Sequence, residues 1–271
     1  MPLTARRHFE LARGLLGTYV ALHFAMLWPY SDELFSSRGM LPSAAASPLS
    51  MAFPNLLTWF DAPWMARFLV GLGALAGILL LSERSARPAA LVAYYVWACL
   101  FGRNPLIANP SLPYVGLMLL VVACVDVRRL SEAGPGRTRH LRVLWVAMCL
   151  GYSYSGFTKL PSPSWADGQA LHYVLVSPLA RPSHVRALLL TLPDGLLQAA
   201  SFGTLALELC FLPLALFERA RPWLWSAMLA LHVALIACVQ FADLSIAMVL
   251  LHVFAFDPRW LARGDASTHH I

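Results

Sequence analysis

Long apolar stretches, separated by short polar segments, dominate the pattern of the chain. A helix needs ~20 predominantly apolar residues to cross the hydrocarbon core of a bilayer. Eight stretches are interpreted as spans of this kind: Leu11–Trp28, Trp64–Leu81, Pro88–Phe101, Leu112–Val127, His140–Phe157, Gly195–Phe217, Trp223–Val239 and Leu244–Phe256. The pattern therefore predicts an all-α fold, a polytopic integral membrane helical bundle of about eight transmembrane helices that forms one domain over residues 1–271.

The number of spans has one alternative. Pro88–Phe101 is short for a membrane-crossing helix, and only Gln240–Asp243 separates the last two spans. A separation that short forces a tight turn at or below the membrane surface. A bundle of seven spans therefore stays open.

Two longer segments lie between the spans. Pro29–Pro63 is rich in Ser, Pro and small residues, and we expect a loop with a short amphipathic or re-entrant helix around Leu49–Phe60. We expect Trp165–Pro193 to do the same, with Ala170–Val176 lying along the interface. Both segments are predicted on the outer side of the membrane.

Composition and charge support a multi-pass membrane protein. The chain is 59% hydrophobic and 13% charged, whereas a soluble globular domain is about 25% charged. Fourteen of the twenty basic residues fall on the side of the N-terminus, and the other six are Arg38, Arg67, Arg103, Lys159, Arg181 and Arg186. The positive-inside rule then predicts that both termini are cytoplasmic. The expected location is a bacterial inner membrane. Basic loops account for the net charge of +6, so no nucleic-acid partner is expected.

Several classes of site have no support in the sequence. Phosphate-binding glycine loops, zinc-protease motifs and nucleophile-elbow motifs are missing. No His pair has ligand spacing on one helix, so no metal is expected. The five cysteines are interpreted as small apolar packing residues: Cys99, Cys124, Cys149, Cys210 and Cys238. Gly73 and Gly77 form a small-residue pair typical of close helix packing.

Ionisable residues inside the spans are the main functional candidates, because polar groups are costly at membrane depth. Glu208 has no basic residue within one helical turn, so it must be protonated or paired with another helix. His232 lies in the middle of a span, as do His23 and His252. Such histidines can form interhelical hydrogen bonds, and together with a Glu they can form a proton relay.

Lys159 is the single lysine beside nineteen arginines. It lies at the outer end of the fifth span, and Pro161, Pro163 and Trp165 follow it. The prolines break the helix and Trp165 is expected at the headgroup level, which would tuck the amine under a lid. Desolvation favours the neutral amine, so Lys159 can act as a general base. The alternative is a lysine that only extends its amine to the interface.

Several segments resemble a known family. They are Arg13–Leu15, Leu34–Pro42, Arg103–Asn109, Ser155–Leu160 with Trp165–Gly168, and His232 with Leu244–Met248. Together they resemble the horizontally transferred transmembrane domain family, whose best-known member is vitamin K-dependent gamma-glutamyl carboxylase. The resemblance covers nearly the whole chain, and its most specific part is the Gly-x-x-Lys-Leu segment followed by Trp-x-x-Gly.

The resemblance implies an outer-face enzyme that resembles a carboxylase or epoxidase and belongs with the lyases. Lys159 would be the base that deprotonates reduced vitamin K or menaquinol, a quinol, and a secreted peptide would be modified beside the membrane lipid. The expected site is catalytic Lys159, His232 and Glu208, with Asn109, Tyr154 and Trp165 in cofactor binding. The alternative is a non-enzymatic accessory protein for peptide maturation or export. A transporter is disfavoured because no internal repeat is evident.

Overall fold

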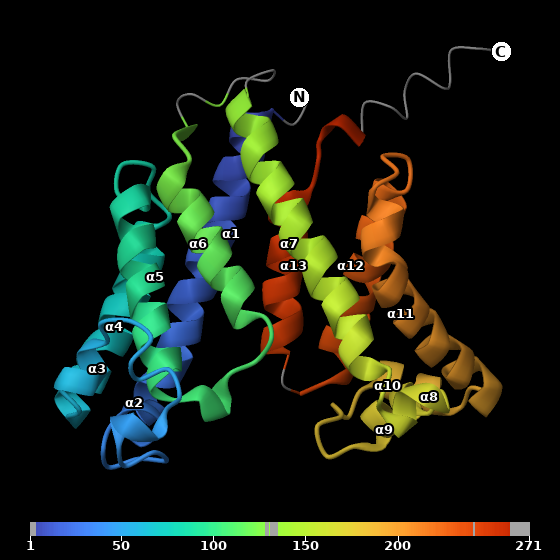
Figure 1. Ribbon diagram of the computed structural model, residues 1–271, viewed down its shortest axis with the longest axis horizontal. Helices are drawn as coiled ribbons and strands as arrows, with labels where there is room; N and C mark the ends of the chain where they lie inside the picture. The colour runs from blue at the N-terminus through green and yellow to red at the C-terminus, as the bar shows by residue number, and fades with distance from the viewer. Residues whose placement is uncertain (1–3, 128–129, 131–134, 241, 261–271) are drawn as a thin grey trace. The chain divides into compact units, whose positions relative to one another are not determined.

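The computed structural model describes residues 4–127, 130, 135–240 and 242–260 (Figure 1). Apart from one isolated bridge, the regular structure of these residues is helical. The long helices are α1 (Ala5–Leu27), α4 (Pro63–Leu79), α5 (Ala86–Arg103), α6 (Leu112–Cys124), α7 (Pro135–Lys159), α11 (Asp194–Ala215), α12 (Arg221–Cys238) and α13 (Asp243–Ala255). Each predicted apolar span coincides with one of these helices, which confirms the all-α prediction.

Fewer helices have the length and hydropathy of a membrane span than the sequence pattern predicts. Among the described residues, three segments are long and apolar enough to cross a membrane: Ala5–Phe35, Asp194–Ala215 and Arg221–Cys238. Pro63–Leu79, Leu112–Cys124 and Asp243–Ala255 are apolar but shorter. The chain thus carries helices of transmembrane type, while the count of eight stays a prediction.

Short helices occupy the two segments predicted outside the bundle. The first segment holds η1 (Trp28–Tyr30), α2 (Ser31–Phe35), η2 (Ala44–Ala46) and α3 (Leu56–Trp59), and η3 (Pro105–Ile107) follows α5. The second holds α8 (Pro163–Ala166), α9 (Ala170–Val176) and α10 (His184–Leu190). The helix expected at Ala170–Val176 is confirmed as α9.

The helix expected around Leu49–Phe60 is shorter than predicted, because only α3 forms there. Pro48 and Pro54 explain the difference, since a proline disfavours helical backbone at the residue before it. Asn55 then begins α3 by accepting a hydrogen bond from the backbone N–H of Leu57 at 2.9 Å.

The chain divides into two compact units, residues 1–140 and 141–271, with the boundary inside α7. Each unit is described by itself, so the single domain over residues 1–271 stays a prediction. Within the first unit, α1 packs closely on α4. A Cβ atom on Gly77 would lie 2.4 Å from the backbone nitrogen of Ala21, and one on Gly73 would lie 2.5 Å from the ring of Phe24. The close packing predicted for Gly73 and Gly77 is confirmed.

The segment before α4 is fastened to the end of α5 by two adjacent side chains. Arg103 is 1% exposed and donates hydrogen bonds to both carboxylate oxygens of Asp61 and to the carbonyl of Leu41. Asn104 donates to the carbonyl of Leu34 at 2.8 Å. Arg103 and Asn104 therefore hold the backbone of the segment before α4 against the end of α5.

In the second unit, α8, α9 and α10 gather at the end where α7 finishes (Figure 1). The chain after α9 forms an antiparallel bridge from Ala180 to Val239, just beyond α12. Arg186 of α10 donates to the carbonyl of Leu175 at 2.6 Å. These bonds hold the short helices as a cap over the end that carries Lys159.

The five cysteines differ in burial. Cys99, Cys149 and Cys238 are buried as predicted, but Cys124 and Cys210 are exposed on their helices, so the packing prediction is wrong for these two. They lie on helix faces that no other helix of their unit covers. The predicted turn Gln240–Asp243 includes residue 241, which lies outside the described residues, as do Arg128, Arg129 and Arg263.

Candidate functional site

Lys159 and Glu208 form a close ion pair between α7 and α11. The Lys159 Nζ atom lies 2.5 Å from both Oε1 and Oε2 of Glu208. The Glu208 side chain is 6% exposed and the Lys159 side chain is 25% exposed. The carboxylate is therefore enclosed while the ammonium keeps an open side. The expectation that Glu208 pairs with another helix is confirmed.

The sequence of α7 brings these two groups together. Tyr152, Ser153, Gly156 and Lys159 recur at intervals of three and four residues, so they share one face of the helix. At Gly156, an added Cβ would lie 2.8 Å from the backbone nitrogen of Leu209. The helices can approach this closely only because Gly156 has no side chain. One turn further on, Lys159 then reaches Glu208.

Ser153 fixes the backbone of α11 at the same place. Its hydroxyl donates to the carbonyl of Glu208 at 3.2 Å and accepts from the N–H of Leu212 at 3.0 Å. Pro213 follows directly and lacks an N–H, so this turn of α11 is the one most easily opened. A side chain of α7 thus holds the helix turn from which Glu208 projects.

Trp165 covers the ammonium, as the sequence pattern predicts. The Lys159 Nζ atom lies 4.6 Å from the centre of the Trp165 ring, a distance typical of a cation–π contact. Gly168 positions the turn that carries Trp165. It has a φ of 76°, a left-handed conformation that favours glycine, and an added Cβ would lie 2.4 Å from Gln198 of α11. Both glycines of the motif therefore pack against α11.

A second polar cluster lies in the core of the same unit. The Tyr152 hydroxyl lies 3.0 Å from His232 Nε2 and 3.5 Å from His252 Nε2. The His232 Nδ1 atom lies 3.4 Å from the hydroxyl of Ser245, and His252 Nδ1 lies 2.8 Å from the carbonyl of Met248. All four of these side chains are buried, so the cluster is an enclosed hydrogen-bond network that joins α7, α12 and α13.

The two clusters form one polar strip. Tyr152 and Lys159 are seven residues apart on the same face of α7, which corresponds to ~10 Å along the helix. Phe211, one turn beyond Glu208 on α11, packs on Tyr152 with ring centres 4.9 Å apart. The two clusters therefore lie along one face of α7, with the ring of Phe211 beside Tyr152.

The predicted site residues are not all brought together. Lys159, Glu208 and Trp165 are in contact, and His232 lies in the neighbouring cluster. Asn109 belongs to the first unit, where its side chain accepts hydrogen bonds from the backbone N–H and hydroxyl of Ser111 at the start of α6. Tyr154 is 72% exposed and lies about 140° around α7 from Lys159. The cofactor roles of Asn109 and Tyr154 stay predictions.

Sequence reasoning missed three residues of the strip. Tyr152 and Ser153 were not considered, and His252 was singled out without being assigned to the site. The signal for Tyr152 and Gly156 was their spacing of seven and three residues from Lys159, which is the spacing of one helix face. No spacing in the sequence could have paired Tyr152 with His252, because the two are a hundred residues apart.

The two members of the ion pair differ in accessibility. The Glu208 side chain is enclosed, whereas the Lys159 side chain is 25% exposed beside Trp165. Lys159 is therefore the member of the pair that a second molecule can reach, and an amine at such a position is a group suited to proton transfer.

Metal binding finds no geometric support in the parts of the chain that are described, where no three His, Cys, Asp or Glu side chains could hold an ion together. The expectation that the protein binds no metal nevertheless stays a prediction.

In comparisons with known proteins, no family model matches the chain, and neither a curated protein nor a solved structure does. The family resemblance of the motif therefore also stays a prediction.

Proposed function

We propose that the protein is a multi-pass membrane enzyme of eight spans in which Lys159 acts as general base on the hydroxyl group of a quinol. The observation that carries the proposal is the Lys159–Glu208 pair under Trp165, in which the Glu208 side chain is 6% exposed and the Lys159 side chain 25%. The quinol would be reduced vitamin K or menaquinol, and the reaction would take place at the outer face of a bacterial inner membrane with both termini cytoplasmic.

The residues of the pair divide the proton transfer between them. Lys159 passes one proton to Glu208 and takes the hydroxyl proton of the quinol, so that the pair ends as an ammonium and a carboxylic acid. The ammonium then lies beside the new oxygen anion and stabilises it. Glu208 cannot donate its proton to bulk water easily, because its side chain is only 6% exposed.

The chemical nature of the site suits a hydroquinone. Trp165 offers an indole face next to the ammonium, and a ring of similar size can stack near it with a hydroxyl directed at Lys159. A bound quinol would supply the reducing equivalents for an oxygen-dependent reaction. The substrate modified in turn would be a secreted peptide, as the resemblance to the carboxylase implies.

Quinol-dependent oxygen uptake by the protein reconstituted in liposomes tests the proposal. Lys159→Met removes the amine, and Lys159→Arg keeps a cation that does not release its proton. We expect both to lower turnover at least 100-fold, while Glu218→Gln leaves it unchanged because Glu218 is 70% exposed and lies beyond the end of α11. Uptake by Lys159→Arg at the wild-type rate would contradict a base at this position.

A non-enzymatic accessory protein is the second candidate, and one observation favours it. The same ion pair also fastens α7 to α11, which is a purely structural task. In that case no quinol would support oxygen uptake by the wild-type protein, and Lys159→Arg would keep whatever peptide export or maturation the protein assists. The two candidates are therefore separated by the wild-type assay alone.

Cysteine labelling in intact cells tests the proposed topology. In a background without the five native cysteines, Met51→Cys and Leu179→Cys would be labelled by an impermeant maleimide, since both sites are highly exposed and lie in the proposed outer segments. Phe217→Cys, between α11 and α12, would require permeabilised cells. Labelling of Phe217→Cys in intact cells would contradict the proposed orientation.

A further inference from the structure

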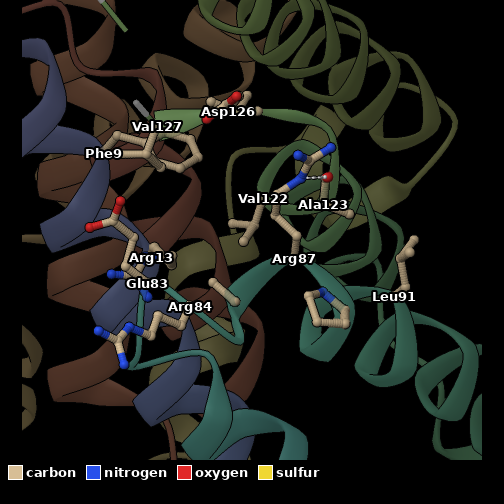
Figure 2. Close-up of a pocket in the computed structure, with 13 residues that line it drawn as sticks. Phe9, Arg13, Glu83, Arg84, Arg87, Leu91, Val122, Ala123, Asp126 and Val127 are labelled. Carbon is tan, nitrogen blue, oxygen red and sulfur yellow. Dashed lines mark hydrogen bonds between the residues drawn. The ribbon is translucent and has the colours of Figure 1, made fainter. Parts of the chain in front are cut away.

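A cavity of about 530 Å³ lies in the first unit and is lined by residues of that unit alone (Figure 2). Its walls come from the first turns of α1, the connection between α4 and α5, the start of α5, and the end of α6 with the residues that follow it. These are the helix ends on the side of the N-terminus. No residue of the candidate site belongs to the cavity.

Three arginines line this cavity. Arg13 is 5% exposed, donates one hydrogen bond to the carbonyl of Leu80, and has no hydrogen-bond partner for its Nε atom among the described residues. Arg87 donates from Nε to the carbonyl of Ala123 at 2.9 Å, which fixes the base of its guanidinium (Figure 2). Arg84 is exposed at the rim. A buried N–H group without a partner calls for an acceptor.

The N-terminus of α5 adds further donors. The hydroxyl of Ser85, its N-cap residue, donates to the carbonyl of Leu79 at 2.8 Å, so no side chain caps the first turn of this long helix. The first backbone N–H groups of a helix lack partners within it and favour an anion. Ala86, the first residue of α5, lines the cavity.

Acidic groups only partly offset these cations. Glu83 and Asp126 also line the cavity, so the lining carries three positive and two negative charges. Glu83 already accepts a hydrogen bond at 3.0 Å from Arg6, which lies outside the lining. The lining therefore carries a net charge of +1, which favours an anionic ligand.

We propose that this cavity binds the phosphate headgroup of an anionic phospholipid of the phosphatidylglycerol type. The arginines and the start of α5 would hold the phosphate. Phe9, Leu91 and Val122 supply an apolar wall beside it, and Leu91 is 54% exposed on α5, where an acyl chain could lie along the helix. A free phosphate would use the cationic part of the cavity alone, so the apolar wall favours the lipid.

Native mass spectrometry of the detergent-solubilised protein tests the site with three probes: dioleoyl phosphatidylglycerol, dioleoyl phosphatidylcholine and glycerol 3-phosphate. We expect phosphatidylglycerol to bind at least tenfold more tightly than the other two. Arg84→Gln with Arg87→Gln should weaken its binding about twentyfold, since one basic residue near an anionic surface contributes about fivefold. The matched control is Arg38→Gln with Arg219→Gln, which removes the same charge from exposed arginines outside the cavity.

Three results would overturn the proposal. Equal affinity for phosphatidylglycerol and phosphatidylcholine would show that the charge of the headgroup does not determine binding. Equal affinity for glycerol 3-phosphate and the lipid would assign the cavity to a soluble phosphate. Equal loss of binding in the control variant would reduce the effect to net charge. Because both cavity arginines chosen are exposed, the variants should fold, and an unchanged unfolding midpoint would establish that they do.

Discussion

The two units of the chain both bury polar side chains, but they use them differently. In the first unit, Asn55 and Asn104 direct their amides at backbone carbonyls, and Arg103 combines a backbone carbonyl with Asp61. In the second unit, Ser153 also bonds to backbone, but the pairs Lys159–Glu208 and Tyr152–His232 join titratable side chains directly to each other. A side chain bonded to backbone holds one conformation, whereas paired titratable groups can also exchange a proton.

This difference distinguishes side chains with a structural role from side chains suited to proton transfer. The family-like segment Arg103–Asn109 acts as a fastener in the first unit, and the Gly-x-x-Lys-Leu segment assembles an ionisable pair in the second. Substitutions in the first unit should therefore cost mainly stability. Substitutions in the second should cost activity beyond what their effect on stability explains.

The largest expected effect is that of Arg103→Met. Arg103 is fully buried and holds Asp61 and Leu41 together, so its loss should lower the free energy of unfolding by about 4 kcal/mol. Arg103→Lys should not restore it, because lysine cannot form the bidentate contact. Unfolding of the solubilised protein measures the effect, with exposed Arg38→Met as control. A loss of unfolding free energy below about 1 kcal/mol for Arg103→Met would contradict the structural role of Arg103 in the first unit.

Next in size is the double-mutant cycle of Lys159 and Glu208. Glu208→Leu leaves the ammonium without its carboxylate and should cost about 3 kcal/mol, while adding Lys159→Met should recover about 2 kcal/mol of that loss. The recovered stability should come with no recovery of quinol-dependent turnover. Additive stability effects would mean that the pair contributes nothing to folding, and recovered turnover would refute its role in chemistry.

A smaller effect is expected for Gly156→Ala. The new Cβ would press on the backbone of Leu209, and overpacking of this kind costs about 2 kcal/mol, partly offset by the better helix propensity of alanine. The helices would separate at Lys159, so turnover should fall as well. Gly203→Ala on α11 is the control, because nothing lies within 4 Å of its added Cβ. Equal behaviour of the two variants would mean that the close approach at Gly156 is unimportant.

The smallest effect on stability is expected for Tyr152→Phe. It removes one hydroxyl and leaves the Nε2 atoms of His232 and His252 without their shared partner, at a cost of about 1 kcal/mol. If the strip carries protons, the dependence of turnover on pH should change in addition to this loss of unfolding free energy. Unchanged turnover at every pH would assign the cluster to packing, as for the polar groups of the first unit.

Much of the candidate site was accessible to sequence reasoning, but not its connections. Lys159, Glu208, His232 and Trp165 stood out because each is an unusual residue for its position in an apolar chain. Tyr152 and Ser153 did not stand out, because Tyr and Ser are unremarkable near the end of an apolar helix. Their roles depend on what faces them from α11, α12 and α13, and no local pattern encodes that.

The sequence by itself determined the helices of this protein. Their apolar runs and the prolines and polar turns between them are local properties, so each predicted span coincides with a helix in the structure. Only the tertiary structure decided which helices approach closely enough to pair their buried charges. That decision depends on side-chain volume at the contact, and the absent side chain of Gly156, which lets α7 meet α11 at Leu209, is what brings Lys159 to Glu208.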